Sequence, residues 1–376
     1  MPPNNITGGF VMTKIRKAKE TMSAKERVLR TFAFEKTDRV PIDYATNGSI
    51  HHRLCVELGI PGDNYDLLLE ALGVDYRGVA PAYTGPLLYP PLPGRQVDPL
   101  YGFYTRWVEN ESGGYHDFCD FPLQGADEET IRAFPFPSPD DFDYDAALEQ
   151  IKRQKDYAVY VGNPGTGDII NSLGRVMGME DTLVNLMTED EATLDLAQRK
   201  LDMELGVMER LLDRAKGGVD FLWMGEDLGT QIAPMISLSM YRSVLRPMHQ
   251  RFIDLAKTYD LPVMVHTCGS SSWVYEDFIE MGVDAVDTLQ PEAVHMSPAY
   301  LKEQFGGRLS FHGCISTAGP LAYGTPADVA RNVTETLEIL MPGGGYHLAP
   351  THQLQDNSPV ENVIAMYQTA HERGVY

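Results

Sequence analysis

The stretch LPVMVHTCGSSS, residues 261–272, decides the fold expected for this chain. It opens with a short apolar run that is typical of a β-strand buried on both faces. The run ends at His266 and Cys268, which are two residues apart and therefore point to the same side of the strand. An imidazole and a thiol side by side are suitable ligands for a soft divalent metal such as zinc. Taken alone, the pair is equally well explained as a core histidine and a core cysteine.

Similar strand-like segments recur along the chain and alternate with segments of helical periodicity. Strands are expected at 37–46, 74–81, 157–163, 219–227, 261–268, 283–290, 308–316 and 345–351. Strands that alternate with helices form right-handed βαβ units and a parallel sheet. Eight such units predict an α/β fold of the (β/α)8 TIM barrel type. No GxGxxG motif follows any of these strands, which disfavours a dinucleotide-binding fold.

The chain is interpreted as a single domain with two additions. Residues 1–22 are expected to be a loose polar N-terminal extension without the apolar segment of a signal peptide. The barrel domain is expected over 23–376. It begins with a helical extension in which Ser23 and Glu26 form a capping-box pattern. The region 82–126 is rich in Pro, Gly and Tyr and has no helical period, so we interpret it as an inserted hairpin or lid over a site.

The composition limits the kinds of partner. A net charge of −22 on 376 residues disfavours binding to nucleic acid or to an anionic membrane surface. The four cysteines form no CxxC motif, which indicates a reducing compartment, and no apolar run has the length of a membrane helix. We therefore expect a cytoplasmic protein that acts on a small molecule, without a nucleic-acid or membrane partner.

The chemistry of a barrel of this kind lies at the carboxyl ends of its strands. Polar residues collect there in the second half of the chain, namely Glu226, Asp227, His266, Cys268, Gln290, Cys314 and His352. A catalytic zinc site uses about three protein ligands and keeps one position open. We expect His352 to be the third metal ligand beside His266 and Cys268, with Cys314 or an acidic residue as the alternatives. His312 lies deeper in its strand and is expected to be hydrogen-bonded within the core.

The other polar residues receive different roles. Glu226 and Asp227 are the candidate catalytic residues, as a fourth ligand or a general base, although a helix-capping role fits them equally well. Gln290, Cys314 and His52 are the candidate substrate-binding residues, and Cys314 suits simple packing too. The middles of the strands are apolar, as expected for the branched side chains that fill a barrel interior (Phe221, Val263, Val286, Leu309).

Longer motifs resemble the uroporphyrinogen decarboxylase superfamily. In chain order they are ERVLRTFAFEKTDRVP, GEDLGTQ, MISLSMYR, VHTCGS, GVDAVDTLQPEA, LSFHGCIS, and PGGGYHLAPTHQLQ with PVEN. The resemblance covers nearly the whole chain and is strongest over 219–366. It implies a (β/α)8 barrel with one of two activities. One is decarboxylation of porphyrinogens without a metal, and the other is methyl transfer with a corrinoid protein at a zinc site made of a His-x-Cys pair and a later Cys.

The chain resembles the methyltransferase branch more than the decarboxylases. The arginine-rich loop with which decarboxylases bind substrate carboxylates reads ATNGSIHHRL here, with Arg53 as its only arginine. A substrate with many carboxylates would need several cationic partners. The chain matches the methyltransferases at His266 and Cys268 and departs from them at His352, which stands where they have a cysteine.

The resemblance therefore implies a zinc-dependent methyltransferase that moves a methyl group between a small substrate and a corrinoid protein. The substrate would be a methyl ether or a thiol. Because no segment resembles a cobalamin-binding domain, the corrinoid would be supplied by a partner protein. Relatives of this type often form dimers, so a homodimer is a further expectation. The alternatives are a metal-free lyase that acts on a carboxylated substrate, and a binding protein without catalytic activity.

Overall fold

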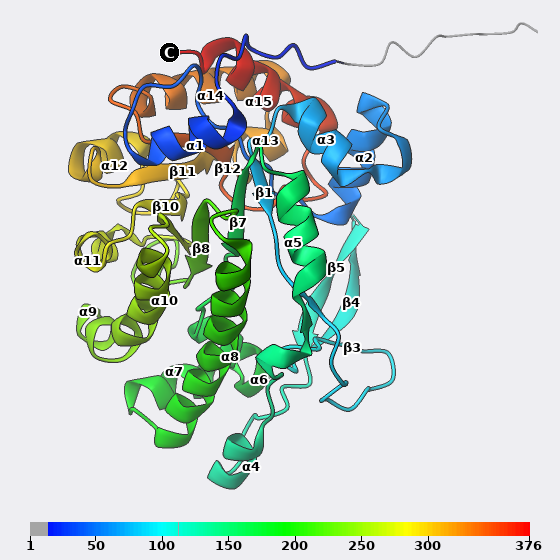
Figure 1. Ribbon diagram of the computed structural model, residues 1–376, viewed down its shortest axis with the longest axis vertical. Helices are drawn as coiled ribbons and strands as arrows, with labels where there is room; N and C mark the ends of the chain where they lie inside the picture. Colours follow the sequence, from blue (N-terminus) through cyan, green and yellow to red (C-terminus); the bar gives the residue numbers. More distant parts are fainter. Residues whose placement is uncertain (1–13, 112) are drawn as a thin grey trace, which may run out of the picture.

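A curled parallel sheet forms the centre of the computed structural model, which describes residues 14–111 and 113–376. Its seven strands follow the order β1-β7-β8-β9-β10-β11-β12. They are β1 (Tyr76–Gly78), β7 (Ala158–Gly162), β8 (Phe221–Gly225), β9 (Val263–Thr267), β10 (Ala285–Thr288), β11 (Ser310–Ile315) and β12 (Tyr346–Pro350). Each lies within a segment where the sequence predicts a strand. Helices connect successive strands and pack around the outside of the sheet (Figure 1).

The strand predicted at 37–46 is reduced to single bridges. Ile42 forms a parallel bridge with Leu348 of β12, and the N–H of Asp75, just before β1, donates to the carbonyl of Ile42 at 2.9 Å. This segment therefore lies between the two edge strands, where the eighth strand of a barrel is expected. Two features prevent a regular ladder. Pro41 has no N–H to donate, and the N–H of Ile42 is taken by the carboxylate of Asp75 at 2.8 Å.

The helices have the following bounds in chain order: α1 (Ala24–Phe32), α2 (Gly48–Leu58), α3 (Tyr65–Leu72), α4 (Glu128–Ala133), α5 (Tyr144–Arg153), α6 (Ile170–Met177), α7 (Met179–Met187), α8 (Glu191–Ala215), α9 (Leu238–Met240), α10 (Arg246–Thr258), α11 (Tyr275–Met281), α12 (Pro298–Phe305), α13 (Pro320–Tyr323), α14 (Pro326–Leu340) and α15 (Val360–Arg373). The short helical turns are η1 (Pro61–Asp63), η2 (Pro139–Asp141), η3 (Tyr241–Leu245) and η4 (Ser272–Val274). Ser23 caps α1 as predicted, because its hydroxyl accepts the N–H of Glu26 at 3.1 Å. Within the described residues, no helix combines the length and the apolar character needed to cross a membrane.

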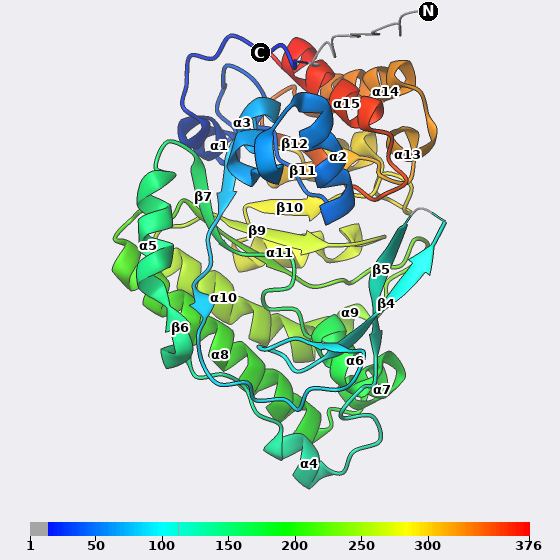
Figure 2. The same cartoon turned by 90° about the vertical axis from the view of Figure 1, so that its right-hand side faces the viewer.

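The predicted insertion contains a β-hairpin. Strands β4 (Tyr104–Asn110) and β5 (Gly113–Cys119) pair antiparallel, and β3 (Gln96–Val97) adds a third strand. A separate pair, β2 (Ala82–Tyr83) with β6 (Phe142–Asp143), joins the start of the insertion to the connector that follows it. In Figure 2 the arrows of β9 and β10 point toward the hairpin, which lies beyond the carboxyl ends of these strands. The insertion is thus placed at the carboxyl ends of the strands.

Aromatic rings and imidazoles fill the inside of the sheet. Trp223 of β8 and His312 of β11 belong to strands three places apart, yet their ring centroids are 5.4 Å apart. Tyr76 of β1 likewise packs on His312, at 5.7 Å. Such contacts between distant strands are formed only across the interior of a curled sheet. The prediction of branched aliphatic side chains in this interior is therefore wrong.

The error is one of phase. Val263 lies three residues before His266, and Val286 lies one residue before Asp287, so both valines are on the opposite face from these polar residues. That opposite face is covered by the outer helices, and it is as well buried as the inner one. A strand buried on both faces has no alternation of polar and apolar residues from which its phase could be predicted.

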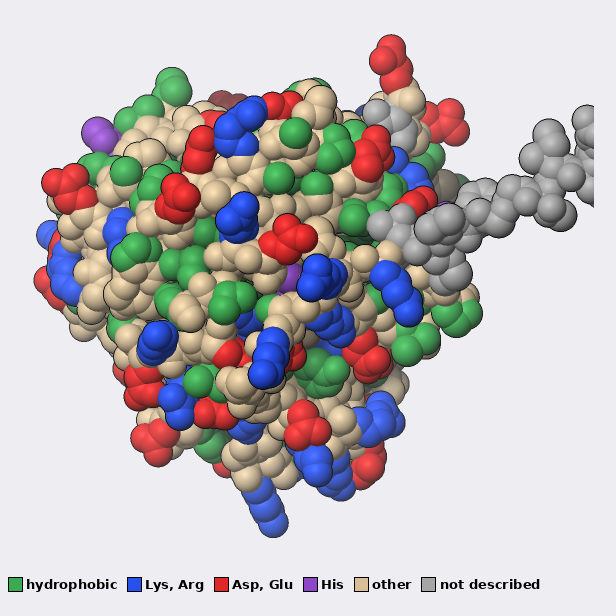
Figure 3. Space-filling view, turned by 90° about the horizontal axis from the view of Figure 1, so that it is seen from above, with side chains coloured by type: hydrophobic (Ala, Val, Ile, Leu, Met, Phe, Trp, Pro, Cys, Tyr) green, Lys and Arg blue, Asp and Glu red, His purple; other side chains and the backbone are tan. Residues whose placement is uncertain are grey.

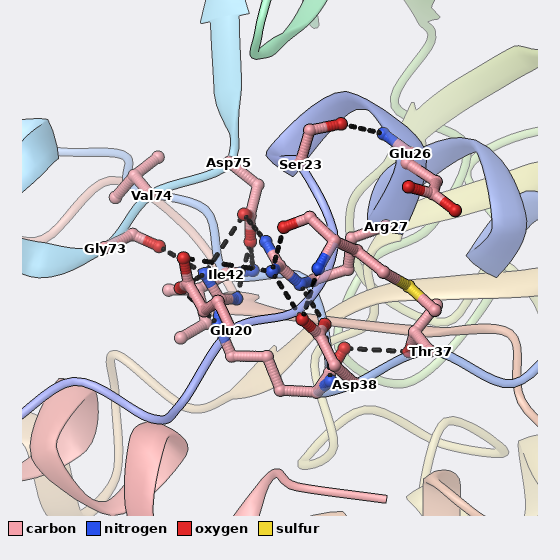
Figure 4. Close-up of polar contacts among 12 residues, drawn as sticks. Glu20, Ser23, Glu26, Arg27, Thr37, Asp38, Ile42, Gly73, Val74 and Asp75 are labelled. Carbon is pink, nitrogen blue, oxygen red and sulfur yellow. Dashed lines mark hydrogen bonds and ion pairs between the residues drawn. The ribbon is translucent and has the colours of Figure 1, made fainter.

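Two buried arginines join α1 to the amino ends of the strands (Figure 4). Arg27 forms ion pairs with Asp38 at 2.7 Å and with Asp75 at 2.6 Å. Arg39 pairs with the other oxygen of Asp75 at 2.7 Å and with Glu20 at 2.7 Å. We call these residues (Glu20, Arg27, Asp38, Arg39 and Asp75) the arginine network. Each arginine has at least two carboxylate partners, which offsets the cost of removing the guanidinium groups from water.

The arginine network corrects the prediction of a loose extension over 1–22. Glu20 belongs to the network, and the N–H groups of Thr21 and Met22 donate to Asp38 at 2.6 and 3.0 Å. Residues 1–13 of the predicted extension lie outside the described residues. Figure 3 shows the molecule from above, from the side of α14 and α15, and acidic and basic side chains are interspersed on this face. The negative net charge is therefore not gathered into one patch on that face.

Candidate metal and substrate site

A cavity of about 760 Å³ lies at the carboxyl ends of the strands. This volume falls within the range of roughly 300–1,000 Å³ that is usual for small-molecule sites. The titratable residues that line it include Asp43, Asp227, His266, Cys268, Asp287 and His312. The predicted insertion contributes to the wall through His116 and Phe118 of β5. The cavity thus combines strand ends and hairpin in one site.

Asp227, His266 and Cys268 form a compact group on this wall. Each offers one metal-ligand atom, and the three atoms all lie within 4.8 Å of one another. The register of the sheet explains the group. Gly225 of β8 is paired with His266 of β9, so Asp227 and Cys268, each two residues further along, come to lie side by side. The N–H of Cys268 donates to Asp227 at 3.0 Å and fixes one oxygen of that carboxylate. The other oxygen accepts the side-chain amide of Asn171 at 2.8 Å.

Asp287 and Thr288 orient the imidazole of His266. Its Nδ1 lies 2.6 Å from a carboxylate oxygen of Asp287 and 2.7 Å from the hydroxyl of Thr288. Its Nε2 therefore faces the group, 3.4 Å from the sulfur of Cys268 and 3.7 Å from Asp227. Burial by itself would lower the pKa of His266, but the hydrogen bonds with Asp287 and Cys268 raise it well above its ordinary value. The cationic imidazole is thus stabilised by negative neighbours on both sides.

The chain of alternating carboxylates and imidazoles continues inward. The second oxygen of Asp287 is 2.5 Å from Nδ1 of His312, and Nε2 of His312 is 3.1 Å from Asp43. We call Asp43, His312, Asp287 and His266 the carboxylate–imidazole chain. Burial disfavours a charged His312, but Asp287 and Asp43 outweigh it and raise its pKa to about 9. The prediction that His312 is hydrogen-bonded within the core is confirmed.

Burial and neighbouring charges act in opposite directions on the other two members of the group. Burial raises the pKa of the Cys268 thiol, and the charge of His266 only partly counteracts this. Burial also opposes ionisation of Asp227, but His266 and the Cys268 N–H together hold the pKa of this carboxyl below its usual range. The group therefore presents a carboxylate and a protonated imidazole beside a protonated thiol. A cation bound between them would favour loss of the thiol proton.

Comparison with known proteins identifies the family. The sequence profile described as Uroporphyrinogen decarboxylase (URO-D) matches residues 174–373, just over half of the chain. The chain belongs to the uroporphyrinogen decarboxylase family. Among solved structures, the methyltransferase from Methanosarcina mazei is similar with a TM-score of 0.64, over 93% of this chain and 99% of that chain, at 18% identity. At this identity the likeness concerns the fold. No curated protein matches the sequence.

In this family member, His352 lies on the wall of the same cavity but outside the compact group. Its side chain is exposed on the turn that follows β12. Asp227, one of the acidic alternatives, stands in the group in its place. Because His352 directly follows the last strand, the sequence predicts that it lies near the cavity. Whether the side chain reaches the other ligands depends on the loop conformation, which periodicity does not predict.

Glu226 points away from the cavity and supports α6. It is almost fully buried, and its carboxylate accepts the N–H groups of Ile169 and Ile170 at 2.7 and 3.1 Å. These are the first N–H groups of α6, where a carboxylate is electrostatically favoured. Burial raises the pKa of Glu226 to about 7, although a hydrogen bond with Asp168 and those backbone N–H groups lower it. This is the helix-capping alternative rather than the catalytic one.

The three residues expected to bind substrate do not line the cavity. Gln290 accepts the N–H of Gly269 at 2.7 Å and so supports the loop after Cys268. His52 lies on α2, where its side chain is 63% exposed and pairs with Asp63 at 2.8 Å.

Cys314 is 1% exposed and has a positive φ of 69°. This conformation ends the alternation of β11, so Cys314 does not follow His312 into the interior.

Sequence reasoning missed several residues of the site. Asp287 and Asp43 lie in short strand-like segments that each contain a second acid, and only the folded arrangement of the strands places these two beside His312. Arg175 of α6 also lines the cavity, although nothing in its helix distinguishes it from a surface arginine. An acidic residue inside an otherwise apolar strand, as in VDAVDTLQ, was the one available signal.

Proposed function

We propose that this family member is a zinc-dependent methyltransferase that moves a methyl group between a small substrate and a corrinoid carried by a partner protein. The observation that carries the proposal is the compact group of Asp227, His266 and Cys268 on the wall of a cavity of small-molecule size. The fold likeness to the methyltransferase from Methanosarcina mazei is compatible with this function. The family match by itself suits both branches of the superfamily.

The donor set fits zinc. A thiolate sulfur, an imidazole nitrogen and a carboxylate oxygen are the ligands that zinc uses, and three protein ligands leave one position for a substrate. Asp287 occupies Nδ1 of His266, which leaves Nε2 for the metal, and this outer carboxylate is a usual partner of a zinc-bound histidine. We therefore assign Asp227 in place of His352 as the third ligand. His352 remains on the cavity wall as a substrate contact.

Zinc bound at this group would supply a Lewis acid, which polarises the oxygen of a methyl ether or stabilises a thiolate. The chain itself holds the ligands in place. The carboxylate–imidazole chain fixes the plane of the His266 ring, and the Cys268 N–H and the Asn171 amide fix the two oxygens of Asp227. The rings of Tyr160 and Trp223 line the cavity and would shield a bound substrate from water.

The rival function is a metal-free lyase of the decarboxylase type. A porphyrinogen carries many carboxylates and needs several cationic residues around it. Within the described part of the chain, Arg175 is the only lysine or arginine on the cavity wall. Arg53, the single arginine of the loop after the first strand, donates instead to the carbonyls of Asp356 and Ser358 at 2.7 and 3.3 Å. The cavity is therefore poorly suited to a polycarboxylate.

Metal content and methyl transfer test the proposal together. The purified protein is expected to contain one zinc per chain and to transfer a methyl group from a methyl ether or to a thiol with cobalamin present. Cys268→Ala should lose both the zinc and the transfer. Cys119→Ala is the matched control, because Cys119 is also a free cysteine but lies in β5 of the hairpin. A Cys268→Ala protein that stays active without metal and releases CO₂ from a carboxylate would establish the lyase instead.

A further inference from the structure

We propose that Arg175 binds a carboxylate of the substrate, so that the site selects flat aromatic molecules that carry one negative charge. This inference rests on the proposed function, since it names the substrate class of the same cavity. Arg175 belongs to α6, is half-buried, and lines the cavity together with Asp227, His266 and Cys268.

The guanidinium of Arg175 is held in place by aromatic rings rather than by an ion pair. It lies over the ring of Phe118, 4.9 Å from the centroid, and 5.7 Å from the centroid of Phe103. Neither an ion pair nor a hydrogen bond joins it to any other residue that the structure describes. An aromatic face attracts the cation but occupies none of its N–H donors. A held guanidinium with free donors is suited to bidentate binding of a carboxylate.

The carboxylates of the cavity are engaged elsewhere. Asp43 and Asp287 accept hydrogen bonds within the carboxylate–imidazole chain, and Asp227 is fixed by Cys268 and by the amide of Asn171. Each of them is thus committed to a partner other than Arg175.

Asp168 is the remaining acid on the wall. Burial and the charge of Glu226 raise its pKa to about 7, against the opposing charges of Lys200 and Arg175. The carboxylate of Asp168 accepts the N–H of Asn171 at 3.3 Å and the hydroxyl of Ser172 at 2.8 Å, so it leaves the N–H donors of Arg175 free.

The remaining wall suits a flat ring. Tyr65, Phe118, Tyr160 and Trp223 line the cavity, and the rings of Tyr160 and Trp223 lie 5.1 Å apart. Trp223 is 6% exposed, and its indole N–H is the one buried side-chain donor among the described lining residues that has no hydrogen-bond partner. Such a donor is costly to leave unpaired and fits an oxygen acceptor of a ligand. Aromatic faces, one donor and one cation together describe an aromatic methyl ether with a carboxylate.

Binding of two probes tests the inference without any turnover. The probes are 4-methoxybenzoate and its neutral counterpart 4-methoxybenzamide, titrated calorimetrically into the zinc-loaded protein. The benzoate is expected to bind about 10- to 100-fold more tightly than the benzamide, the usual range for a charge-assisted hydrogen bond. Arg175→Gln should remove this preference by weakening the benzoate alone, and Arg175→Lys should keep part of it. Arg106→Gln, which removes an exposed arginine of β4 outside the cavity wall, should leave both affinities unchanged.

Equal binding of the two probes, binding of neither, or an unchanged preference in Arg175→Gln would overturn the inference. Cys268→Ala separates it from the proposed function. If Arg175 holds the carboxylate, the preference for benzoate survives in Cys268→Ala even though zinc and methyl transfer are lost. If zinc holds the carboxylate, the preference disappears in Cys268→Ala and survives in Arg175→Gln.

Discussion

Buried charges gather at both ends of the sheet, but the two groups are built from different residues. The arginine network at the amino ends pairs Arg27 and Arg39 with three carboxylates. The carboxylate–imidazole chain at the carboxyl ends pairs carboxylates with His266 and His312. Arginine stays charged at all accessible pH values and does not bind metals, whereas imidazole titrates and is a common metal ligand. The first group is therefore suited to permanent cohesion, and the second to chemistry.

The pKa values at the two ends follow the same division. Burial opposes the charge of Asp38, but its hydrogen bonds to Arg27 and to backbone N–H groups hold its pKa far below the usual range. Its charge is thus constant between pH 5 and pH 8. His312, by contrast, has a pKa of about 9, and Asp168 beside the cavity has a pKa of about 7. Of these residues, Asp168 at the carboxyl end is the one that gains or loses a proton near neutral pH.

The largest effect on stability is expected at the amino end. Asp75→Ala would leave both Arg27 and Arg39 without their shared partner, and breaking a buried pair in this way costs about 3–5 kcal/mol. Urea unfolding should show a fall of this size in the free energy of unfolding. His52→Ala is the matched control, because it breaks only the exposed pair with Asp63 and should cost at most about 1 kcal/mol. A loss below 1 kcal/mol in Asp75→Ala would contradict the structural role of the network.

Together with its hydrogen-bonded neighbour Glu226, Asp168 should contribute to the pH dependence of stability. Its pKa rises from 3.8 to about 7 on folding, so the folded protein keeps a proton that the unfolded chain has released. This contribution is complete below about pH 4 and is lost as the pH rises through about 7, with a slope of at most about 1.4 kcal/mol per pH unit. Unfolding of the metal-free protein at several pH values measures the slope. Asp168→Asn should flatten it, and Asp145→Asn on the exposed face of α5 should not.

A third prediction concerns the support of the metal group. Asp287→Asn keeps the size of the side chain but weakens its hold on Nδ1 of His266, so zinc affinity should fall by about 10- to 100-fold. Competition with a chromophoric chelator measures this change. Asp43→Asn, one step further from His266 along the chain, is expected to have a smaller effect. Equal zinc affinities of Asp287→Asn and the unaltered protein would show that the carboxylate–imidazole chain does not serve the site.

The smallest effect is expected at His52. The side chain is exposed and lies outside the cavity wall, so His52→Ala should leave the affinity for 4-methoxybenzoate and the rate of methyl transfer within about twofold. His352→Ala provides the comparison, because His352 lies on the wall and should change substrate affinity while zinc is retained. A change in affinity in His52→Ala larger than that in His352→Ala would reverse this assignment.

The sequence predicts best what depends on spacing along one strand. His266 and Cys268 are two residues apart at the end of an apolar run, and this alone places them together at the rim. Asp227 is predicted as part of the rim, but as a third ligand only among the alternatives to His352. Asp227 lies close to Cys268 because Gly225 is paired with His266 in the neighbouring strand. The spacing of residues within one strand does not predict the register between two strands.

The remaining errors have local physical causes. The interior was predicted one residue out of phase because Val263 and Val286 lie in strands that are buried on both faces. The first strand was predicted as regular, but Pro41 and the carboxylate of Asp75 interrupt its hydrogen bonds. Arg175 was missed because a single arginine on an amphipathic helix carries no signal of the cavity it faces.

Zinc K-edge absorption spectroscopy, combined with metal analysis, tests the central claim most directly. The account predicts one zinc per chain with a single sulfur ligand in the unaltered protein. Cys268→Ala and Asp227→Ala should lose the zinc, and His352→Ala should retain the same spectrum. A protein that binds no zinc, or one in which Cys268→Ala retains a sulfur-ligated zinc, would contradict the claim that Asp227, His266 and Cys268 hold the metal.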